Sequence, residues 1–79
     1  MPTLLNEKGF RFFFYSKENN EPCHVHVEKG NAEGKIWLEP IVKIGFLINF
    51  TKSEEKDILT IINNNQENFK TRWYEYFNQ

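Results

Sequence analysis

The sequence predicts an α+β fold: a three- to four-stranded antiparallel meander with one long or broken C-terminal helix packed on one face. Two observations lead to this prediction. Up to about residue 50 the apolar residues come in short, alternating runs, and from residue 51 onward they recur at helical spacing. A chain of 79 residues is too short for two independent hydrophobic cores, so we expect a single domain over residues 1–79.

Three segments have the length and composition of β-strands, and each is followed by residues that favour a turn. These segments are Phe10 to Ser16, His24 to Glu28 and Gly34 to Leu38. The second is followed by Gly30-Asn31, which suits a tight turn, and the third by Pro40, which has no N–H for a ladder. Short turns between consecutive strands predict an antiparallel meander.

The segment 41–50 is ambiguous, and the segment after it begins a helix. β-Branched residues in 41–50 favour a fourth strand, whereas Gly45 would weaken a strand or mark a bulge. Thr51 and Glu54 fit a capping box, in which each side chain satisfies a free N–H group at a helix start. The helical pattern then continues through Ile58, Ile61, Ile62, Phe69, Trp73, Tyr76 and Phe77, as one helix or as two broken at Asn63-Asn64-Asn65.

Each predicted strand has two rows of side chains, because successive residues point to opposite sides of a sheet. The apolar row should face the helix: Phe10, Phe12, Phe14, Cys23, Val25, Val27, Ile36 and Leu38. The side turned away from the helix, which we call the outer face, carries Arg11, Phe13, Tyr15, His24, His26, Glu28, Lys35 and Trp37. Clustered exposed aromatic residues usually indicate contact with another molecule, so we interpret the outer face as the functional surface. Alternatively, residues 41–50 or the chain end fold over it, and Phe13 and Trp37 form a second small core.

The two histidines suggest general acid–base chemistry on the outer face. His24 and His26 lie two residues apart on one strand, so their rings should be neighbours, and imidazoles titrate near neutral pH. With cations to stabilise an anion, such a pair suits metal-free RNA cleavage at a 2'-hydroxyl. We therefore expect His24 and His26 as acid and base, Lys35 and Arg11 as anion stabilisers, and Phe13, Tyr15 and Trp37 as binding residues that stack on bases.

Two other roles for the histidines remain open. A metal site of His24, His26 and Glu28 is a weak prediction, because residues four apart on a straight strand are about 13 Å apart. We expect no metal and no other cofactor, and keep a metal-dependent hydrolase as a further alternative. In the simplest interpretation both imidazoles only hydrogen-bond across strands, to Tyr15 or to Glu28.

Charge and cysteine content restrict the class of protein. Ten basic and eleven acidic residues give a net charge of -1, so RNA binding would need a local basic patch. The single Cys23 cannot form an internal disulfide and points to the predicted core, which favours a reducing compartment and a buried, unreactive thiol. The chain has no apolar stretch of about 18 residues and no signal peptide at Met1, so we expect a cytoplasmic protein without a membrane partner.

Five ordered segments carry a family resemblance: Met1-Pro2-Thr3, Arg11 to Ser16, Pro22 to Val27, Lys35 to Pro40 and Trp73 to Phe77. Together they resemble a small bacterial domain-of-unknown-function family, DUF4160. Members typically read Pro-Pro-His-Val-His-Val, so Cys23 departs from the pattern and further weakens the case for a thiol mechanism. No activity is implied by the resemblance. Genes of this family often lie beside another small gene in an arrangement resembling toxin–antitoxin modules. The resemblance therefore implies a cognate small protein as partner and an RNA-directed activity.

The leading hypothesis is a component of a toxin–antitoxin-like pair that acts on RNA or on a partner protein through the outer face. The alternative is a non-catalytic module that binds an antitoxin-like partner protein or a second copy of itself. The sequence leaves open whether the chain is an enzyme.

Overall fold

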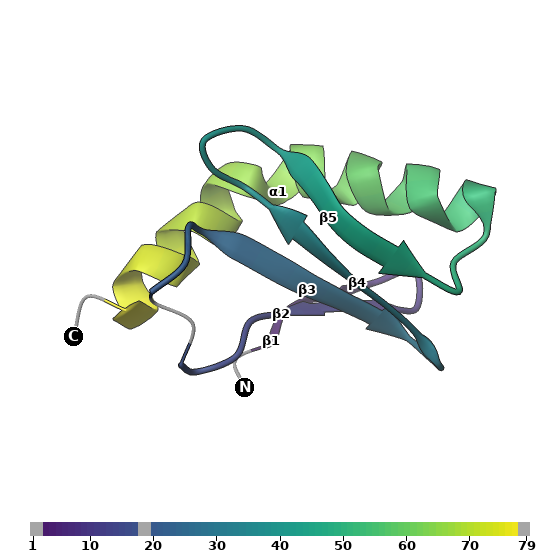
Figure 1. Ribbon diagram of the computed structural model, residues 1–79, viewed down its shortest axis with the longest axis horizontal. Coiled ribbons are helices and arrows are strands. Elements are labelled where there is room, and N and C mark those ends of the chain that lie inside the picture. Colours follow the sequence, from purple (N-terminus) through teal and green to yellow (C-terminus); the bar gives the residue numbers. More distant parts are fainter. Residues whose placement is uncertain (1–2, 18–19, 78–79) are drawn as a thin grey trace.

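The computed structural model describes residues 3–17 and 20–77, and in this part of the chain five strands precede one helix (Figure 1). The elements are β1 (Thr3–Glu7), β2 (Phe10–Phe13), β3 (His24–Lys29), β4 (Ala32–Trp37), β5 (Lys43–Ile48) and α1 (Lys52–Phe77). The strands form one antiparallel sheet in the order β1-β2-β3-β4-β5. The predicted α+β meander with one C-terminal helix is confirmed, with five strands rather than three or four.

The strand that the sequence analysis missed is β1. It pairs with β2 through a two-residue turn, in which Lys8 has a φ of 55° and Gly9 a φ of 83°, and Glu7 lies opposite Phe10. Hairpin turns of this kind need positive φ at both central residues. A lysine rarely supplies it, so the sequence signal for this turn is weak.

The strand β5 confirms that residues 41–50 contain a fourth predicted strand, and it contains a bulge. Phe46 lies opposite Lys35 and Ile44 lies opposite Ile36, so that Gly45 is the extra residue. A Cβ atom on Gly45 would lie 3.0 Å from the carbonyl oxygen of Lys35, so this close approach favours glycine. The bulge explains why the alternation of residues 41–50 is irregular in the sequence.

The helix α1 starts at the predicted capping box and is continuous. The backbone N–H of Thr51 donates to Glu54 Oε1 at 2.9 Å, and the backbone N–H of Glu54 donates to Thr51 Oγ1 at 3.0 Å. Of the two alternatives for this segment, the structure has the single helix, without a break at residues 63–65. There the side chain of Asn65 donates from Nδ2 to the carbonyl oxygen of Ile61 at 2.8 Å, within the helix.

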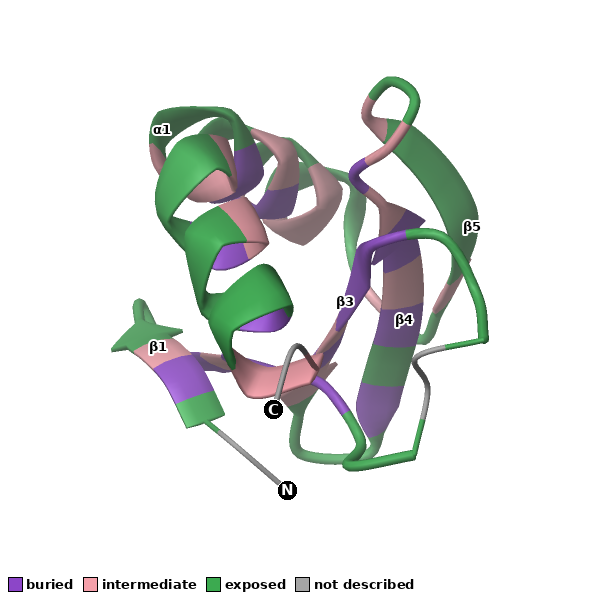
Figure 2. Cartoon of the chain, turned by 90° about the vertical axis from the view of Figure 1, so that its left-hand side faces the viewer, coloured by how far each residue is buried: buried purple, intermediate pink, exposed green. Residues whose placement is uncertain are grey.

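The hydrophobic core lies between α1 and the concave side of the curved sheet (Figure 2). All eight residues predicted for the apolar row are buried: Phe10, Phe12, Phe14, Cys23, Val25, Val27, Ile36 and Leu38. From the helix they meet Ile58, Ile61, Ile62, Phe69 and Trp73. This packing leaves the convex side of the sheet, the outer face, turned away from α1.

The helix is longer than the sheet that it covers. Its 26 residues span about 39 Å, whereas a six-residue strand spans about 20 Å. The C-terminal turns of α1 therefore extend past the start of β3 (Figure 1), where Trp73 and Phe77 each lie 5.3 Å from Phe14 between ring centroids. In the described residues, no helix carries an apolar run that could cross a membrane.

Candidate functional site

The outer face is organised in rows that run across the strands. The central row consists of Phe13, His26, Lys35 and Phe46, one residue from each of β2, β3, β4 and β5. A second row contains Arg11, Glu28, Glu33 and Ile48, and a third contains His24, Trp37 and Lys43. The sheet thus brings together the side chains predicted for this surface, and it adds three residues of β5 to them.

His26 occupies the centre of the outer face and is half-buried. Its ring stacks on Phe13, with 5.5 Å between centroids and 26° between planes. The ring of Tyr15 meets His26 edge-on at 4.7 Å. A hollow of about 140 Å³ lies against these rings and is lined by Phe13, Tyr15, His26, Val27, Glu28, Glu33, Gly34 and Phe46. His26 therefore presents one edge to a small, aromatic-walled depression.

The two cations predicted to stabilise an anion are each paired with a carboxylate. Arg11 Nη1 lies 3.3 Å from Glu28 Oε2, and its guanidinium sits 4.3 Å from the ring centroid of Phe13. Lys35 Nζ lies 2.9 Å from Glu21 Oε1. It also sits 4.3 Å from the ring centroid of Trp37. A carboxylate thus neutralises each of the two positive charges, and each cation also lies over the face of an aromatic ring.

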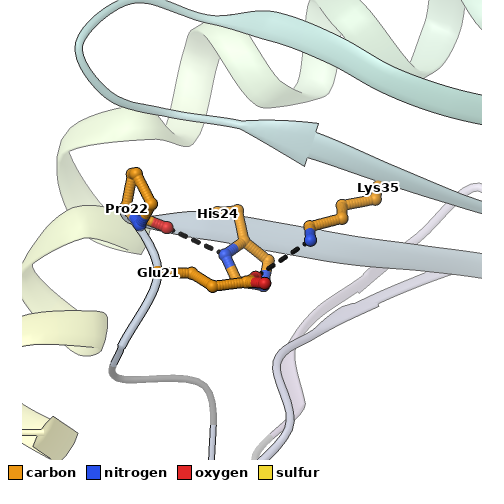
Figure 3. Close-up of polar contacts among 4 residues, drawn as sticks. All are labelled: Glu21, Pro22, His24 and Lys35. Atoms are coloured by element: carbon orange, nitrogen blue, oxygen red, sulfur yellow. Dashed lines mark hydrogen bonds and ion pairs between the residues drawn. The ribbon is translucent and has the colours of Figure 1, made fainter.

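The expectation that His24 is exposed on the outer face is wrong. Its side chain is 0% exposed, and its ring lies 4.9 Å from Trp73 and 5.2 Å from Trp37. The ring atom Nδ1 donates to the carbonyl oxygen of Pro22 at 2.9 Å, and Nε2 lies 3.7 Å from Glu21 Oε1 (Figure 3). His24 is the first residue of β3, at the end of the sheet that α1 overhangs. Strand alternation points the His24 side chain away from the helix, but the overhanging end of α1 contacts it through Trp73.

The aromatic residues predicted to bind on the outer face differ in accessibility. Tyr15 is 44% exposed, whereas Trp37 is half-buried and Phe13 is buried. The expectation that Phe13 is exposed is wrong, because Arg11 covers its ring and Tyr15 packs edge-on against it at 5.3 Å. Only part of the predicted aromatic surface is therefore open to contact.

The weak metal candidates do not form a ligand set. His24, His26 and Glu28 alternate along β3, so each belongs to a different one of the three rows that run across the strands. Among residues 3–17 and 20–77, no three His, Cys, Asp or Glu side chains gather closely enough to hold an ion. The described geometry therefore does not bring His24, His26 and Glu28 together as ligands of one ion.

Sequence reasoning missed the contribution of β5 to this surface. Phe46 and Ile48 lie on the outer face and are exposed. At the start of β5, an apolar hollow of about 360 Å³ is lined by Pro22, Trp37, Glu39, Pro40, Ile41 and Lys43. The signal was present as an apolar run in residues 41–48, but the bulge at Gly45 obscured which residues share a face.

Two groups near Glu39 have raised pKa values. Burial, with the Glu39 carboxylate adding to it and Lys70 opposing it, raises the pKa of the Cys23 thiol to about 12. The Tyr74 hydroxyl donates to Glu39 Oε1, and this hydrogen bond, helped by some desolvation, raises the pKa of Tyr74 to about 12. The buried thiol therefore stays protonated at neutral pH, as a filler of the core rather than a nucleophile.

Comparison with known proteins gives one match. A family model described as "Domain of unknown function (DUF4160)" matches residues 9–74, a range that includes β2 through most of α1. No curated protein and no solved structure matches the chain.

Proposed function

We propose that this chain, which belongs to the DUF4160 family, is a protein-binding module whose outer face docks a small cognate protein. One observation carries the proposal. The half-buried His26 shares a hollow with the exposed side chains of Tyr15 and Phe46, and the exposed Ile48 lies on the same face. Arg11 and Lys35 on this surface are already paired with carboxylates. Aromatic and aliphatic anchors around a desolvated centre are characteristic of protein interfaces.

The charges of the outer face favour a protein over a polyanion. Arg11 is held by Glu28 and Lys35 by Glu21, and Glu33 adds a negative charge opposite Glu28, which balances the positive charge of Lys43 at the start of β5. An RNA phosphate would have to displace these carboxylates from the cations. Nucleic-acid binding draws most of its affinity from cations that neutralise phosphates, so this arrangement supports a weakly polar protein partner instead.

The size of the hollow beside His26 supports an anchoring role. At about 140 Å³ it is smaller than the roughly 300–1,000 Å³ typical of small-molecule pockets. It suits a single side chain inserted from a partner. The stacking of Phe13 and the edge-on contact of Tyr15 hold His26 in one orientation, which lowers the entropy lost on binding.

Where a small gene lies beside the gene of this chain, as the family resemblance implies, co-expression with its product tests the proposal. With a tag on that partner, the wild-type chain should co-purify, and calorimetry should give a binding constant for the pair. Tyr15→Ala should weaken binding by about tenfold or more, because an interface anchor typically contributes at least 1–2 kcal/mol. The matched control is Tyr74→Ala, since Tyr74 on α1 is also 44% exposed but lies outside the outer face. Equal binding by the Tyr15 and Tyr74 variants would contradict the proposal, as would the absence of binding by the wild type.

A second candidate function is RNA cleavage by acid–base chemistry at His26. The observation that favours it is the accessible imidazole edge in the hollow beside Tyr15. In that mechanism Arg11 and Lys35 would hold phosphate after release from their carboxylates. His24, being buried, would act only as a positioning residue behind His26, with 5.2 Å between the two ring centroids. Cleavage of a single-stranded RNA by the wild type and its loss in His26→Gln would support this candidate, and an inert wild type would exclude it.

A further inference from the structure

The strand β5 ends the sheet, and its outer edge carries backbone groups that no neighbouring strand pairs in the described chain. Proteins usually protect such an edge with charged side chains, proline or a covering segment. The opposite edge, β1, follows this rule, because exposed Asn6 and Glu7 and the turn residue Lys8 make it polar. The sequence of β5, Lys-Ile-Gly-Phe-Leu-Ile, has one charge, at its first position.

Large apolar side chains of β5 are also exposed to solvent. Ile44 is 41% exposed, Phe46 39% and Ile48 47%. Three large apolar residues on one open edge strand are an aggregation hazard unless another chain covers them. The β5 edge therefore resembles one side of a protein–protein interface.

The bulge at Gly45 allows two copies of β5 to pair antiparallel with side chains of the same face opposite each other. Antiparallel strands in one sheet pair residues that face the same side. Lys43 and Ile48 lie opposite Trp37 and Glu33 and so belong to the outer face, although they are five positions apart. Ile44 and Leu47 lie opposite Ile36 and Gly34, on the inner side. Without the extra residue Gly45, residues five or three positions apart would face opposite sides.

Two copies of β5, placed antiparallel about the middle of the strand, would therefore match face to face. Lys43 would lie opposite Ile48 of the other copy, and Ile44 opposite Leu47. A parallel arrangement would instead put the two Lys43 side chains side by side, where like charges repel. The pattern of this strand thus selects one relative orientation of two identical chains.

The charges are complementary in the same arrangement. Glu33 is the β4 neighbour of Ile48, on the outer face. Lys43 of the second copy would flank Ile48 from the other side, two strand spacings or about 10 Å from Glu33 between backbones. A lysine and a glutamate side chain together cover that distance. The twofold symmetry repeats the contact, so that two Lys43–Glu33 pairs would close over the two Ile48 side chains.

From these observations we propose that β5 pairs antiparallel with β5 of a second copy of this chain, forming a closed dimer with a continuous ten-stranded sheet. The twofold axis runs perpendicular to the sheet, since the paired residues face the same side. Both outer faces then lie on one side of the dimer. The inference rests on the sheet edge and not on the hollow at His26, although Phe46 and Ile48 of β5 also belong to the outer face.

Sedimentation velocity of the full chain over a concentration series tests the proposal, with two kinds of variant. Ile44→Lys places a charge opposite the apolar Leu47 of the other copy and should convert the dimer to monomer, a loss of at least about hundredfold in association. Asn6→Lys makes the same kind of change on the opposite edge and should leave the dimer intact. Circular dichroism melts establish that both variants are folded.

The charge pair gives a second test that leaves the apolar contacts in place. Lys43→Glu alone and Glu33→Lys alone should each weaken the dimer by about tenfold, because each creates like charges at two symmetrical positions. The double variant Lys43→Glu with Glu33→Lys should restore association. A monomeric wild type at high micromolar concentration, a dimer that survives Ile44→Lys, a failure of the double variant to recover, or open-ended growth beyond the dimer would each overturn the proposal.

Discussion

The imidazole of His24 packs against the indole of Trp73, with 4.9 Å between the ring centroids and no exposed surface left on His24. This contact joins the first residue of β3 to the overhanging end of α1. The alternation of β3 predicts both histidines on the outer face. In the structure His24 is buried at the end of the sheet that α1 overhangs, whereas His26 lies half-buried on the outer face. The outer face is therefore built around one imidazole rather than two.

The contact predicts that Trp73 is a major contributor to stability. Trp73 is buried and meets Phe14 and Phe77 as well as His24. Replacing it with alanine removes a large buried ring, which typically costs about 3–5 kcal/mol of unfolding free energy. Urea unfolding followed by circular dichroism measures the loss. The neighbouring exposed residue gives the control, because Arg72→Ala should change the free energy by no more than about 0.5 kcal/mol. Similar effects of the two changes would show that α1 does not close this end of the sheet.

Most of the fold could be predicted from the sequence, because strand alternation and helical spacing report directly on burial. The eight residues of the apolar row and the capping box of Thr51 and Glu54 were predicted correctly. The strand β1 was missed, because its hairpin turn uses Lys8 at positive φ. The register of β5 was hidden by the bulge at Gly45. The first failure arises because Lys8 adopts a φ that lysine rarely takes, and the second because one extra residue interrupts the two-residue period of a strand.

The candidate site was less predictable than the fold. Alternation correctly placed Arg11, Tyr15, His26 and Lys35 on one surface, because that rule depends only on the strand. It failed for His24, whose burial depends on how far α1 extends beyond the sheet. It also gave no information on the carboxylates that pair with Arg11 and Lys35. Those contacts depend on strand register and on a loop, and one sequence specifies neither.

The capping box predicts a specific dependence of stability on pH. Its backbone hydrogen bond from Thr51, followed by the contact with Lys29, holds the pKa of the Glu54 carboxyl below its ordinary value of 4.5. A lowered pKa in the folded state means that the stabilisation is complete above pH 4.5 and is lost as the pH falls through the folded-state pKa. Glu54→Gln should therefore flatten the acid side of the stability curve.

Chemical denaturation at several pH values between 2 and 7 measures this effect. The matched control is Glu55→Gln, which changes the next carboxylate of the same turn and leaves the capping box intact. Thr51→Ala should cost about 1 kcal/mol, since it removes the N-cap hydroxyl that accepts from the Glu54 N–H. An unchanged acid limb in Glu54→Gln would show that the capping box does not form in solution.

The burial of Cys23 predicts that its thiol is inert in the folded protein. With a pKa of about 12, only about one thiol in ten thousand is ionised at pH 8, and the sulfur is also out of reach of a reagent. A chromogenic disulfide reagent should therefore label Cys23 only as fast as the protein unfolds. In 6 M guanidinium, roughly enough to unfold most small domains, labelling should be immediate. Rapid labelling of the native protein would refute the assignment of Cys23 to the core.

We propose that the outer face, and not α1, contacts the partner protein. This is tested by titrating the isotopically labelled chain with the product of an adjacent small gene, the partner that the family resemblance implies, and following the amide chemical shifts. We predict that the largest changes fall on Tyr15, His26 and Phe46, and that the exposed side of α1 around Arg72 is unaffected. Changes centred on α1, with the amides around His26 unmoved, would contradict the account.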